Sequence, residues 1–190
     1  MNHLIGITGK AGSGKDTVAH ILHTRRGYHC MALAAPLRAG LMAMLGLDGS
    51  HFEHPKKEQL LPIIDKSPRQ LLQLLGTEWG RHLIHPELWT MLATRRIADI
   101  RALNPGVNII ISDVRFDNEA HMIRQLGGEV WHISRAGAGT PHAHISESGI
   151  VFDEADRIIQ NNGTIIDLHN TVQSFVLDYL MPFEHRQATA

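Results

Sequence analysis

Short apolar runs alternate along the chain with longer stretches whose apolar residues recur every three or four positions. The runs have the length of strands, and they lie at 3–8, 28–34, 107–112, 129–134 and 157–159. The longer stretches have the spacing of amphipathic helices, and they lie at 18–26, 36–45, 67–75, 87–103, 117–126 and 166–180. Strands that alternate with helices predict an α/β fold with a parallel sheet flanked by helices.

Two of the predicted helices have well-defined boundaries or faces. The helix at 67–75 begins with Ser67 as N-cap and Pro68 in its first turn, and we expect it to end before Gly76. The segment before it, 46–62, is polar and rich in turn residues, which indicates a mobile or inserted segment. The apolar stripe expected on the helix at 87–103 consists of Leu88, Met91, Leu92 and Ile97.

A glycine-rich segment, GKAGSGKDT, connects the first predicted strand to the first predicted helix. Gly9 is followed, after four residues, by Gly14 and Lys15, which is the spacing of a phosphate-binding loop. Glycines allow successive backbone N–H groups to turn toward phosphate oxygens, and Lys15 adds a positive charge at the start of the helix. The sequence therefore predicts that this loop binds phosphate.

Asp16 stands where the usual pattern of this loop has a Ser or Thr whose hydroxyl contacts Mg²⁺. Its carboxylate could favour the first turn of the helix, or it could hold the metal directly or through water. Thr17 follows directly and offers the hydroxyl that Asp16 lacks. The sequence leaves the choice between these two residues open.

The most apolar predicted strand ends at Asp113, which places this carboxylate at the carboxyl edge of the sheet, beside the phosphate-binding loop. We expect Asp113 to position Mg²⁺ or to accept hydrogen bonds from a substrate. The alternative role is the N-cap of the next helix, although Asp117 or Asn118 suits that role better. Arg115 lies within reach of the same edge, and Glu119 could orient it.

Further candidates for ligand binding lie outside these motifs. Arg69 lies in the first turn of a predicted helix, where the helix dipole opposes a cation, so it is either an anion-binding residue or a solvated surface arginine. Trp79 and Trp89 are candidates for base stacking, although core packing explains most tryptophans. The stretch 135–149 has no clear periodicity and predicts a long loop, as in active-site lids or disordered connectors. Its candidate residues are Arg135, which we expect to face phosphate, and His144, Ser146 and Glu147.

Length, charge and composition exclude several classes of protein. A chain of 190 residues and 21.1 kDa fits one domain. The net charge of −1 and pI near 6.9 provide no general field for a polyanion, so a nucleic-acid polymer is not the expected partner. No apolar run reaches membrane-spanning length and the first strand begins at once, so we expect neither a membrane span nor a signal peptide, and we expect a cytoplasmic protein.

Cysteine and histidine usage limits the metal sites. The single cysteine, Cys30, excludes an intrachain disulfide framework and a Cys-based zinc site, and its strand-like surroundings predict a buried thiol. Several of the 14 histidines lie close together in sequence, but no such pair has an evident third ligand. Mg²⁺ bound with a nucleotide is therefore the only metal we expect.

The ordered set of motifs resembles the P-loop nucleoside monophosphate kinases, and more closely the phage-type deoxynucleoside monophosphate kinases. The segment between 46 and 67 is shorter than in the longer phage members. The segments that carry the resemblance are GSGKDT at 12–17, RQLLQLLGTE at 69–78, Asp113 to Arg115 with Glu119, Arg135 to Gly137, HISE at 144–147 and NNGT at 161–164.

The resemblance implies a P-loop NTPase three-layer fold in one domain, 1–190, with a helical acceptor-binding region at about 47–103 and a lid at about 135–149. It implies Mg²⁺-dependent transfer of the γ-phosphate of ATP to a deoxynucleoside monophosphate. The implied catalytic residues are Lys15, Asp113, Arg115 and Arg135, and the implied metal ligands are Asp16, Thr17 and Asp113. The implied ATP-binding residues are Gly9, Lys10, Ala11, Gly12, Ser13, Gly14, Lys15, Asp16, Thr17, Asn161 and Gly163. The implied acceptor-binding residues are Arg69, Trp79, Trp89, Arg115, Glu119, His144 and Glu147.

Two other functions share these features. Another P-loop small-molecule kinase, such as one acting on dephospho-coenzyme A, would use the same loop and lid. A nucleotide-binding switch or polymer-coupled ATPase would need no small acceptor, but several arginines suited to a second phosphate and the lack of a basic stripe argue against it. The sequence leaves open the preferred base, the choice between ribose and deoxyribose, and the oligomeric state, a homodimer being one option.

Overall fold

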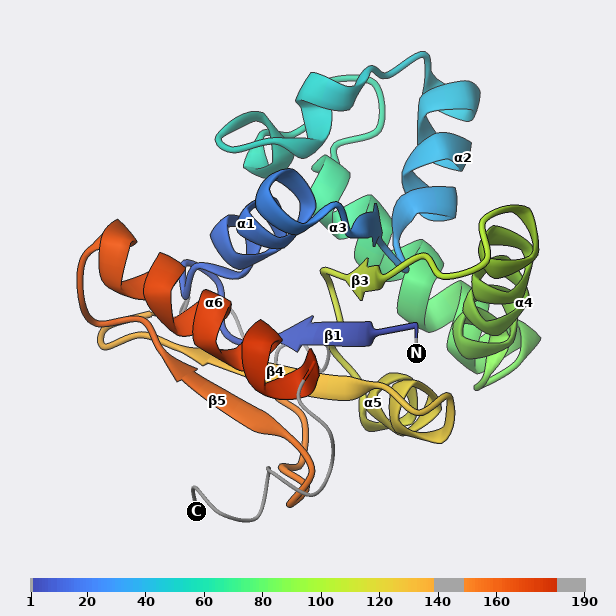
Figure 1. Cartoon of the computed structure of the whole chain (residues 1–190). Coiled ribbons are helices and arrows are strands. Elements are labelled where there is room, and N and C mark those ends of the chain that lie inside the picture. Colours follow the sequence, from blue (N-terminus) through green and yellow to red (C-terminus); the bar gives the residue numbers. More distant parts are fainter. Residues whose placement is uncertain (1, 139–148, 181–190) are drawn as a thin grey trace.

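The structure, a computed structural model, describes residues 2–138 and 149–180. Five strands form one sheet in the order β2-β3-β1-β4-β5, and all neighbouring strands run parallel (Figure 1). The sequence-based prediction of a parallel α/β fold is confirmed, with some strands shorter than their apolar runs. The strands are β1 (Leu4–Thr8), β2 (His29–Met31), β3 (Ile109–Ile111), β4 (Glu129–Ser134) and β5 (Arg157–Gln160).

Helices follow or precede each strand, as the periodicity predicts. The α-helices are α1 (Lys15–Arg26), α2 (Ala35–Leu45), α3 (Pro68–Gln73), α4 (Leu88–Leu103), α5 (Asp117–Gln125) and α6 (Ile165–Leu180). Two 3-10 turns, η1 (Gly49–Phe52) and η2 (Lys56–Glu58), lie in the turn-rich segment before α3, and η3 (Leu74–Ile84) is a π-helix.

The sheet separates two apolar layers because successive side chains of a strand point to opposite faces. Ile110 belongs to the core formed with α1 and α6, whereas Ile109 and Ile111 belong to the core formed with α4 and α5. All three side chains are fully buried. Fully burying such a side chain contributes about 1.5–3 kcal/mol, so the β3 triplet anchors both layers.

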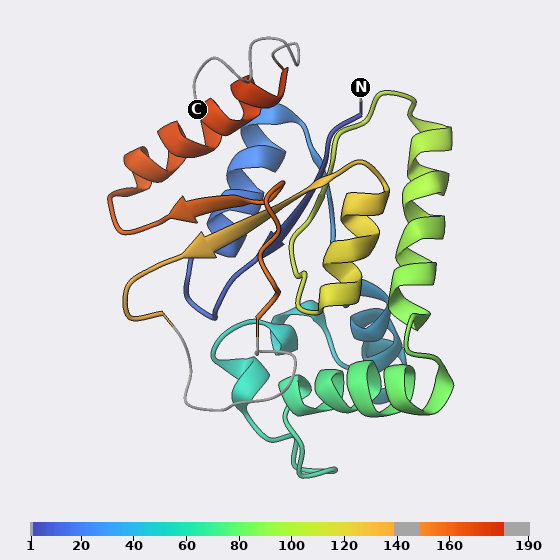
Figure 2. The ribbon, with the colours of Figure 1, turned by 90° about the horizontal axis from the view of Figure 1, so that it is seen from below.

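The parallel direction brings the carboxyl ends of the strands to one edge of the sheet. The register pairs Gly6 with Ile111 and Thr8 with His132, so the residues after β1, β3 and β4 emerge side by side. Figure 2 shows the segment from α2 to η3, coloured blue to green, gathered beyond this edge. The site therefore lies between the sheet edge and this helical segment.

The helix predicted to end before Gly76 instead continues, as α3 and then η3, to Ile84. Two glycines of this helix contact Trp89 in different ways. The Trp89 Nε1–H donates to the Gly76 carbonyl at 2.7 Å, and a Cβ on Gly80 would collide with the indole ring. Gly76 therefore does not end the helix. The prediction was wrong because Trp89, which bonds to Gly76, lies 13 residues further along the chain.

The predicted buried face of α4 was also wrong in part. Met91 and Leu92 are 60% and 46% exposed, and Leu88 is half-buried. The residues that α4 buries are Trp89, Thr90, Ala93 and Ile97. Trp89, Ala93 and Ile97 are spaced four apart, so they form one stripe, and this stripe packs on η3 and the sheet in place of the more apolar neighbouring one.

Cys30 lies on β2, at the outer edge of the sheet, and it is exposed. The prediction of a buried thiol was therefore wrong. An edge strand lacks a neighbouring strand on one side, so a strand-like apolar run does not ensure burial there. No helix within 2–138 or 149–180 combines the length and apolarity that crossing a membrane requires.

Replacement of Ile110 by Ala tests the role of β3 in the layer formed with α1 and α6. The cavity left in the centre of the sheet should lower the free energy of unfolding by about 2–5 kcal/mol, measured by urea denaturation. The matched control is Ile63→Ala, because Ile63 is 96% exposed and its loss should change stability by no more than about 0.5 kcal/mol. Equal losses in the two variants would contradict this account of the core.

Candidate active site

The phosphate-binding loop (Gly9–Thr17) has the backbone that its glycines permit. Gly9, Gly12 and Gly14 have φ angles of 143°, 76° and 103°, in the region that favours glycine. The Lys15 ammonium donates hydrogen bonds to the carbonyls of Gly9 at 2.7 Å and Lys10 at 2.9 Å, so it lies over the loop at the start of α1. The first-turn N–H groups of α1 and the lysine charge together form an anion-binding site.

Asn161 supports this loop from the neighbouring turn after β5. Its side chain is buried, and Nδ2 donates to the Ser13 carbonyl at 2.8 Å. Gly163 lies against Asp167, whose carboxylate accepts the Thr164 N–H at the start of α6. Both were predicted to bind ATP, and the structure places Asn161 directly against the loop and Gly163 in the adjoining turn.

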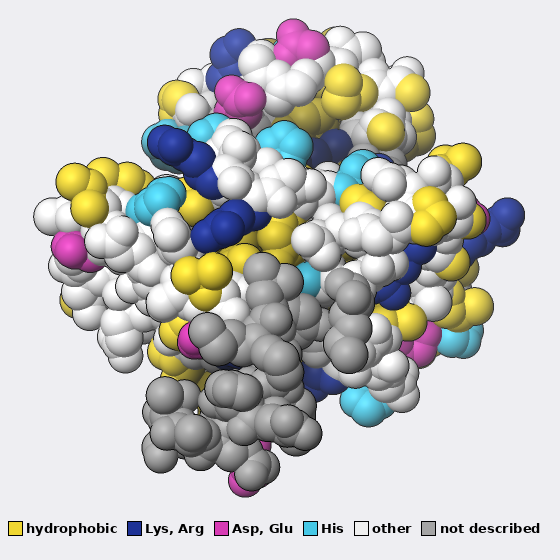
Figure 3. Space-filling model, in the orientation of Figure 1, with side chains coloured by type: hydrophobic (Ala, Val, Ile, Leu, Met, Phe, Trp, Pro, Cys, Tyr) yellow, Lys and Arg dark blue, Asp and Glu magenta, His cyan; other side chains and the backbone are white. Residues whose placement is uncertain are grey.

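A cavity of about 720 Å³ opens at the carboxyl edge of the sheet, a size typical of small-molecule sites. Residues after β1, β2 and β3 form its floor, and residues of η1, α3 and η3 form the opposite wall. Figure 3 shows basic and histidine side chains around the hollow below the segment from α2 to η2, which lies at the top of the view. The Lys and Arg residues that line the cavity are Lys10, Lys15, Arg38, Lys57, Arg69, Arg81 and Arg115.

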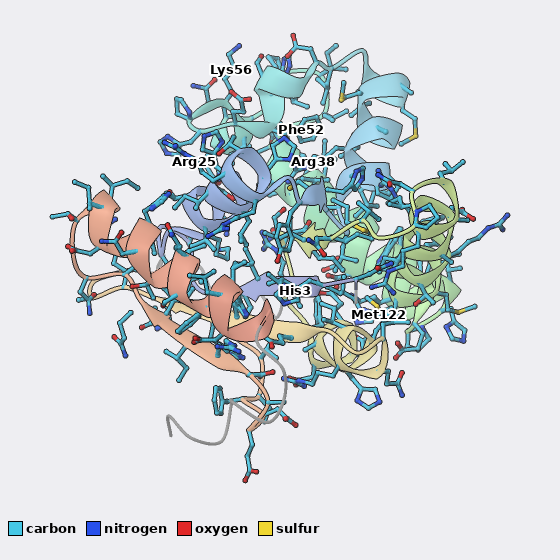
Figure 4. The ribbon with its side chains drawn as sticks, in the orientation of Figure 1. His3, Arg25, Arg38, Phe52, Lys56 and Met122 are labelled. Atoms are coloured by element: carbon cyan, nitrogen blue, oxygen red, sulfur yellow. The ribbon has the colours of Figure 1, made fainter. Side chains whose placement is uncertain are left out.

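These seven cations face four acidic residues of the described cavity lining, which are Asp16, Glu53, Asp113 and Glu119. The excess of positive charge is local, because the whole chain has a net charge of −1. Such a cavity favours a small ligand with several negative charges over a long polyanion. Arg38 and Phe52 line it together and lie close to each other in Figure 4.

Asp113 connects the end of β3 to the turn before α2. Its Oδ1 accepts the Leu33 N–H at 2.7 Å and its Oδ2 accepts the Ala34 N–H at 3.0 Å. The N-cap of α5 is Phe116, so neither Asp113 nor the predicted Asp117 or Asn118 takes that role. Each carboxylate oxygen of Asp113 retains a further lone pair, and the residue lines the cavity.

Asp16 lines the cavity as well, whereas Thr17 is not among the described residues that do so. Partial burial of its sulfur raises the pKa of the Cys30 thiol, although the residue as a whole is exposed, and the charges of Asp113 and Asp16 act in the same direction. Mg²⁺ in kinases typically binds one or two carboxylates together with substrate phosphates. The donor set of Asp16 and Asp113 fits such an ion.

Glu119 is the buried acid at the turn between β3 and α5. It forms an ion pair with Arg81 of η3, and it accepts the backbone N–H groups of Arg115 at 2.7 Å and Phe116 at 3.2 Å. Burial raises the pKa of Glu119 to about 7, while the Arg115 N–H and the Arg81 charge act against that shift. Glu119 therefore fixes the backbone of Arg115.

Arg81 is a cavity residue that sequence reasoning missed. Its guanidinium lies 3.9 Å from the centre of the Phe116 ring and donates to the Asn118 side chain at 3.1 Å, in addition to the pair with Glu119. The error follows from ending the helix at Gly76. A signal was available, because Arg69, Gln73, Thr77 and Arg81 recur every four residues and all line the cavity.

The other predicted acceptor residues separate into two groups. Arg69 and Arg115 line the cavity, and the Arg69 Nη1 also contacts Glu58 of η2 at 3.0 Å, so Arg69 is not a solvated surface residue. Trp89 forms part of the wall, but it is 8% exposed and its indole N–H donates to the Gly76 carbonyl. These contacts indicate a packing role for Trp89 rather than base stacking. Trp79 is 46% exposed and is not among the described residues that line the cavity.

The predicted lid is only partly described. Arg135 follows β4, is exposed, and is not among the described lining residues. Gly149 and Ile150, at the other end of the segment, do line the cavity. His144 and Glu147 lie outside the described residues.

Comparison with known proteins gives consistent results. Residues 48–172 match the family model described as deoxynucleotide monophosphate kinase. A relative in Acanthamoeba polyphaga mimivirus is 30% identical over 184 residues, which cover 91% of this chain and 95% of the relative. The deoxynucleoside-5'-monophosphate kinase of Escherichia phage T5 is 42% identical over 69 residues, 36% of this chain and 26% of the phage protein.

The matches to phage relatives span less than half of those proteins' own length. Among solved structures, dephospho-CoA kinase from Campylobacter jejuni superposes with a TM-score of 0.52 at 14% identity, over 94% of this chain and 98% of that one. This likeness supports the fold alone. The family model and the mimivirus relative together cover most of the chain, and the chain therefore belongs to the deoxynucleotide monophosphate kinase family.

Proposed function

We propose that the protein transfers the γ-phosphate of ATP to a deoxynucleoside monophosphate, giving ADP and a deoxynucleoside diphosphate. The observation that carries the proposal is that one cavity joins the phosphate-binding loop to a second group of cations on other elements, Arg69 and Arg115. A site for two phosphate-bearing ligands needs two such groups facing one space. The family of the chain supports the same reaction.

On the donor side, the loop N–H groups and Lys15 hold the phosphates of ATP and stabilise charge as the phosphoryl group moves. Asp16 and Asp113 would hold Mg²⁺, which neutralises charge on the phosphate oxygens when it is bound. The structure favours Asp16 over Thr17 for this role, because Asp16 lines the cavity. Asn161 keeps the loop in place through Ser13.

On the acceptor side, Arg69 and Arg115 hold the monophosphate. A guanidinium grips phosphate through two parallel hydrogen bonds. Arg115 keeps its place because Glu119 holds its backbone, and Glu119 is in turn paired with Arg81. The segment at about 47–103 is the acceptor-binding region, and the segment at about 135–149, with Arg135, is the lid.

The reaction needs no covalent nucleophile, because phosphoryl transfer depends mainly on positioning and on charge stabilisation. The arrangement of the cavity suits this requirement, since cations approach from the loop, from α2, from the helical wall and from the turn after β3. Closure over the two substrates would also exclude water from the transferring group.

The direct test is an ADP-release assay over all ribo- and deoxyribonucleoside monophosphates. We expect ATP consumption to require both Mg²⁺ and a deoxynucleoside monophosphate, and chelation of the metal to abolish it. Dephospho-coenzyme A, and a mixture without any acceptor, serve as comparison reactions. Folded, ATP-binding protein that phosphorylates no monophosphate in the panel would refute the proposal.

Replacement of Lys15 by Ala should lower kcat/KM by a few hundred-fold, because it deletes one preorganised charge-stabilising donor. The circular dichroism spectrum should stay unchanged, since the side chain bonds to loop carbonyls and takes no part in either apolar core. The matched control is Lys56→Ala, because Lys56 is exposed and lies away from the cavity lining (Figure 4). Near-normal turnover of the Lys15 variant would exclude this role.

Replacement of Arg69 by Ala should raise the KM for the monophosphate and lower kcat, with the KM for ATP nearly unchanged. The reason is that a loosely held acceptor oxygen seldom lies in line with the γ-phosphate. Arg69→Lys should recover only part of the loss, because an ammonium cannot form the paired hydrogen bonds.

The control for Arg69 is its own ion-pair partner. Glu58→Ala removes the contact between Arg69 and η2 but leaves the guanidinium in place. If Arg69 binds the acceptor, Glu58→Ala should change the kinetics far less than Arg69→Ala. If the two variants show the same defect, Arg69 acts only by holding η2.

A further inference from the structure

His132 lies at the carboxyl end of β4, and none of the motifs described above includes it. Its Cα pairs with that of Thr8, the residue directly before the phosphate-binding loop, so the two backbones are one strand spacing apart. Its neighbours Trp131 and Ile133 pack toward α1 and α6, so the imidazole points to the opposite face, where it lines the cavity. The phosphate-binding loop contributes Gly9 and Lys10 to the lining of the same cavity.

One nitrogen of the His132 ring is fixed by a buried carboxylate. His132 Nε2 lies 2.8 Å from Asp156 Oδ2, and the Asp156 side chain is fully buried. Burial acts to raise the pKa of Asp156, but hydrogen bonds from Arg124, the Asp153 N–H and His132 outweigh it and lower that pKa. Asp156 is therefore ionised and can only accept, so Nε2 carries the proton.

Asp156 does not need His132 for its own neutralisation. Arg124 of α5 donates to both of its oxygens, from Nε at 3.0 Å and from Nη2 at 2.6 Å, and the Asp153 N–H adds a third bond at 3.0 Å. The charge of a buried carboxylate is already compensated when one arginine donates a hydrogen bond to each of its oxygens. The additional bond therefore acts on the histidine, whose orientation it fixes.

The second nitrogen, Nδ1, has no hydrogen-bond partner within 2–138 and 149–180. The ring is 19% exposed and packs edge-on against Phe152, with the two ring centres 5.4 Å apart. Besides Asp156, Arg124 and Asp153 on the buried side, the charged groups on the cavity side include Lys15, Asp113 and Arg115. The Asp156 carboxylate lies on one side of the ring, and a phosphate bound in the cavity would lie on the other.

We propose that His132 is a catalytic residue that donates a hydrogen bond from Nδ1 to the phosphoryl group in transfer, with Asp156 as its positioning residue. This inference rests on the proposed function. In this role both ring nitrogens donate, Nε2 to Asp156 and Nδ1 to the phosphoryl group, so the acting form carries a second proton supplied by solvent, and no covalent bond to the histidine forms or breaks. The role is charge stabilisation at the start of the phosphate-binding loop, and β4, which carries His132, and β3, which Asp113 follows, lie on either side of β1.

Two amide substitutions distinguish the contacts of the two ring nitrogens of His132. The amide of Asn reaches the position of Nδ1, and the longer Gln reaches that of Nε2. His132→Gln therefore keeps the contact with Asp156 and loses the group that faces the cavity, whereas His132→Asn does the reverse. We expect kcat to fall by about 100-fold in His132→Gln, by much less in His132→Asn, and the KM values for both substrates to change little.

The measurement is steady-state kinetics of the full chain with ATP and the best monophosphate of the panel, with thermal denaturation of each variant. A structural role for His132 predicts the opposite order, with near-normal kcat in His132→Gln and the larger loss in His132→Asn. That order, or equal kcat values in the two variants, would overturn the inference. The matched control is His121→Gln, because His121 is exposed on α5 and lies outside the cavity lining.

The role of Asp156 is tested by a double-mutant cycle. Asp156→Asn should lower kcat in the parent protein and have little further effect on kcat in His132→Gln, because it acts through the ring. Equal effects in both backgrounds would exclude Asp156 as the positioning residue. A parent protein that phosphorylates no monophosphate would instead refute the proposed function, which the panel assay shows independently of these variants.

Discussion

The parallel direction of the five strands is the constraint on which the site depends. Parallel strands need a crossover after each strand, and the helices that make these crossovers bury both faces of the sheet. The carboxyl edge remains accessible. The loop after β1, Asp113 after β3 and His132 on β4 lie close together there, because these three strands are neighbours in the sheet. The core thus fixes the spacing of groups that belong to distant parts of the sequence.

The ion pair between Arg81 and Glu119 connects this edge to the helical wall opposite. Removing two charges from water costs as much as their attraction returns in many proteins, so a buried pair is weak evidence for added stability. Its effect here is geometric. Glu119 holds the turn that carries Arg115, Arg81 belongs to η3, and the bond between them joins the two sides of the cavity.

Local patterns were sufficient to predict much of the fold and the place of the phosphate-binding loop between β1 and α1. The phosphate-binding loop is continuous in sequence, and the apolar run before Asp113 marks a central strand, so neither depends on a distant partner. Arg81 and His132 escaped prediction because their partners, Glu119 and Asp156, lie 38 and 24 residues away. Gly76 was misread for a similar reason, since the Trp89 indole that donates to its carbonyl lies on another helix.

Cys30 is the single cysteine of the chain, so a thiol reagent would label this protein at one position. The thiol is exposed on the edge strand, no other cysteine competes for a reagent, and the carboxylates of Asp16 and Asp113 act on it electrostatically. Only the thiolate reacts with alkylating reagents, so the raised pKa slows labelling at neutral pH. Burial is the largest cause of that raised pKa, and a cation held by the two carboxylates would remove their smaller contribution to it. A faster alkylation would then report the occupancy of the site in protein that is not turning over.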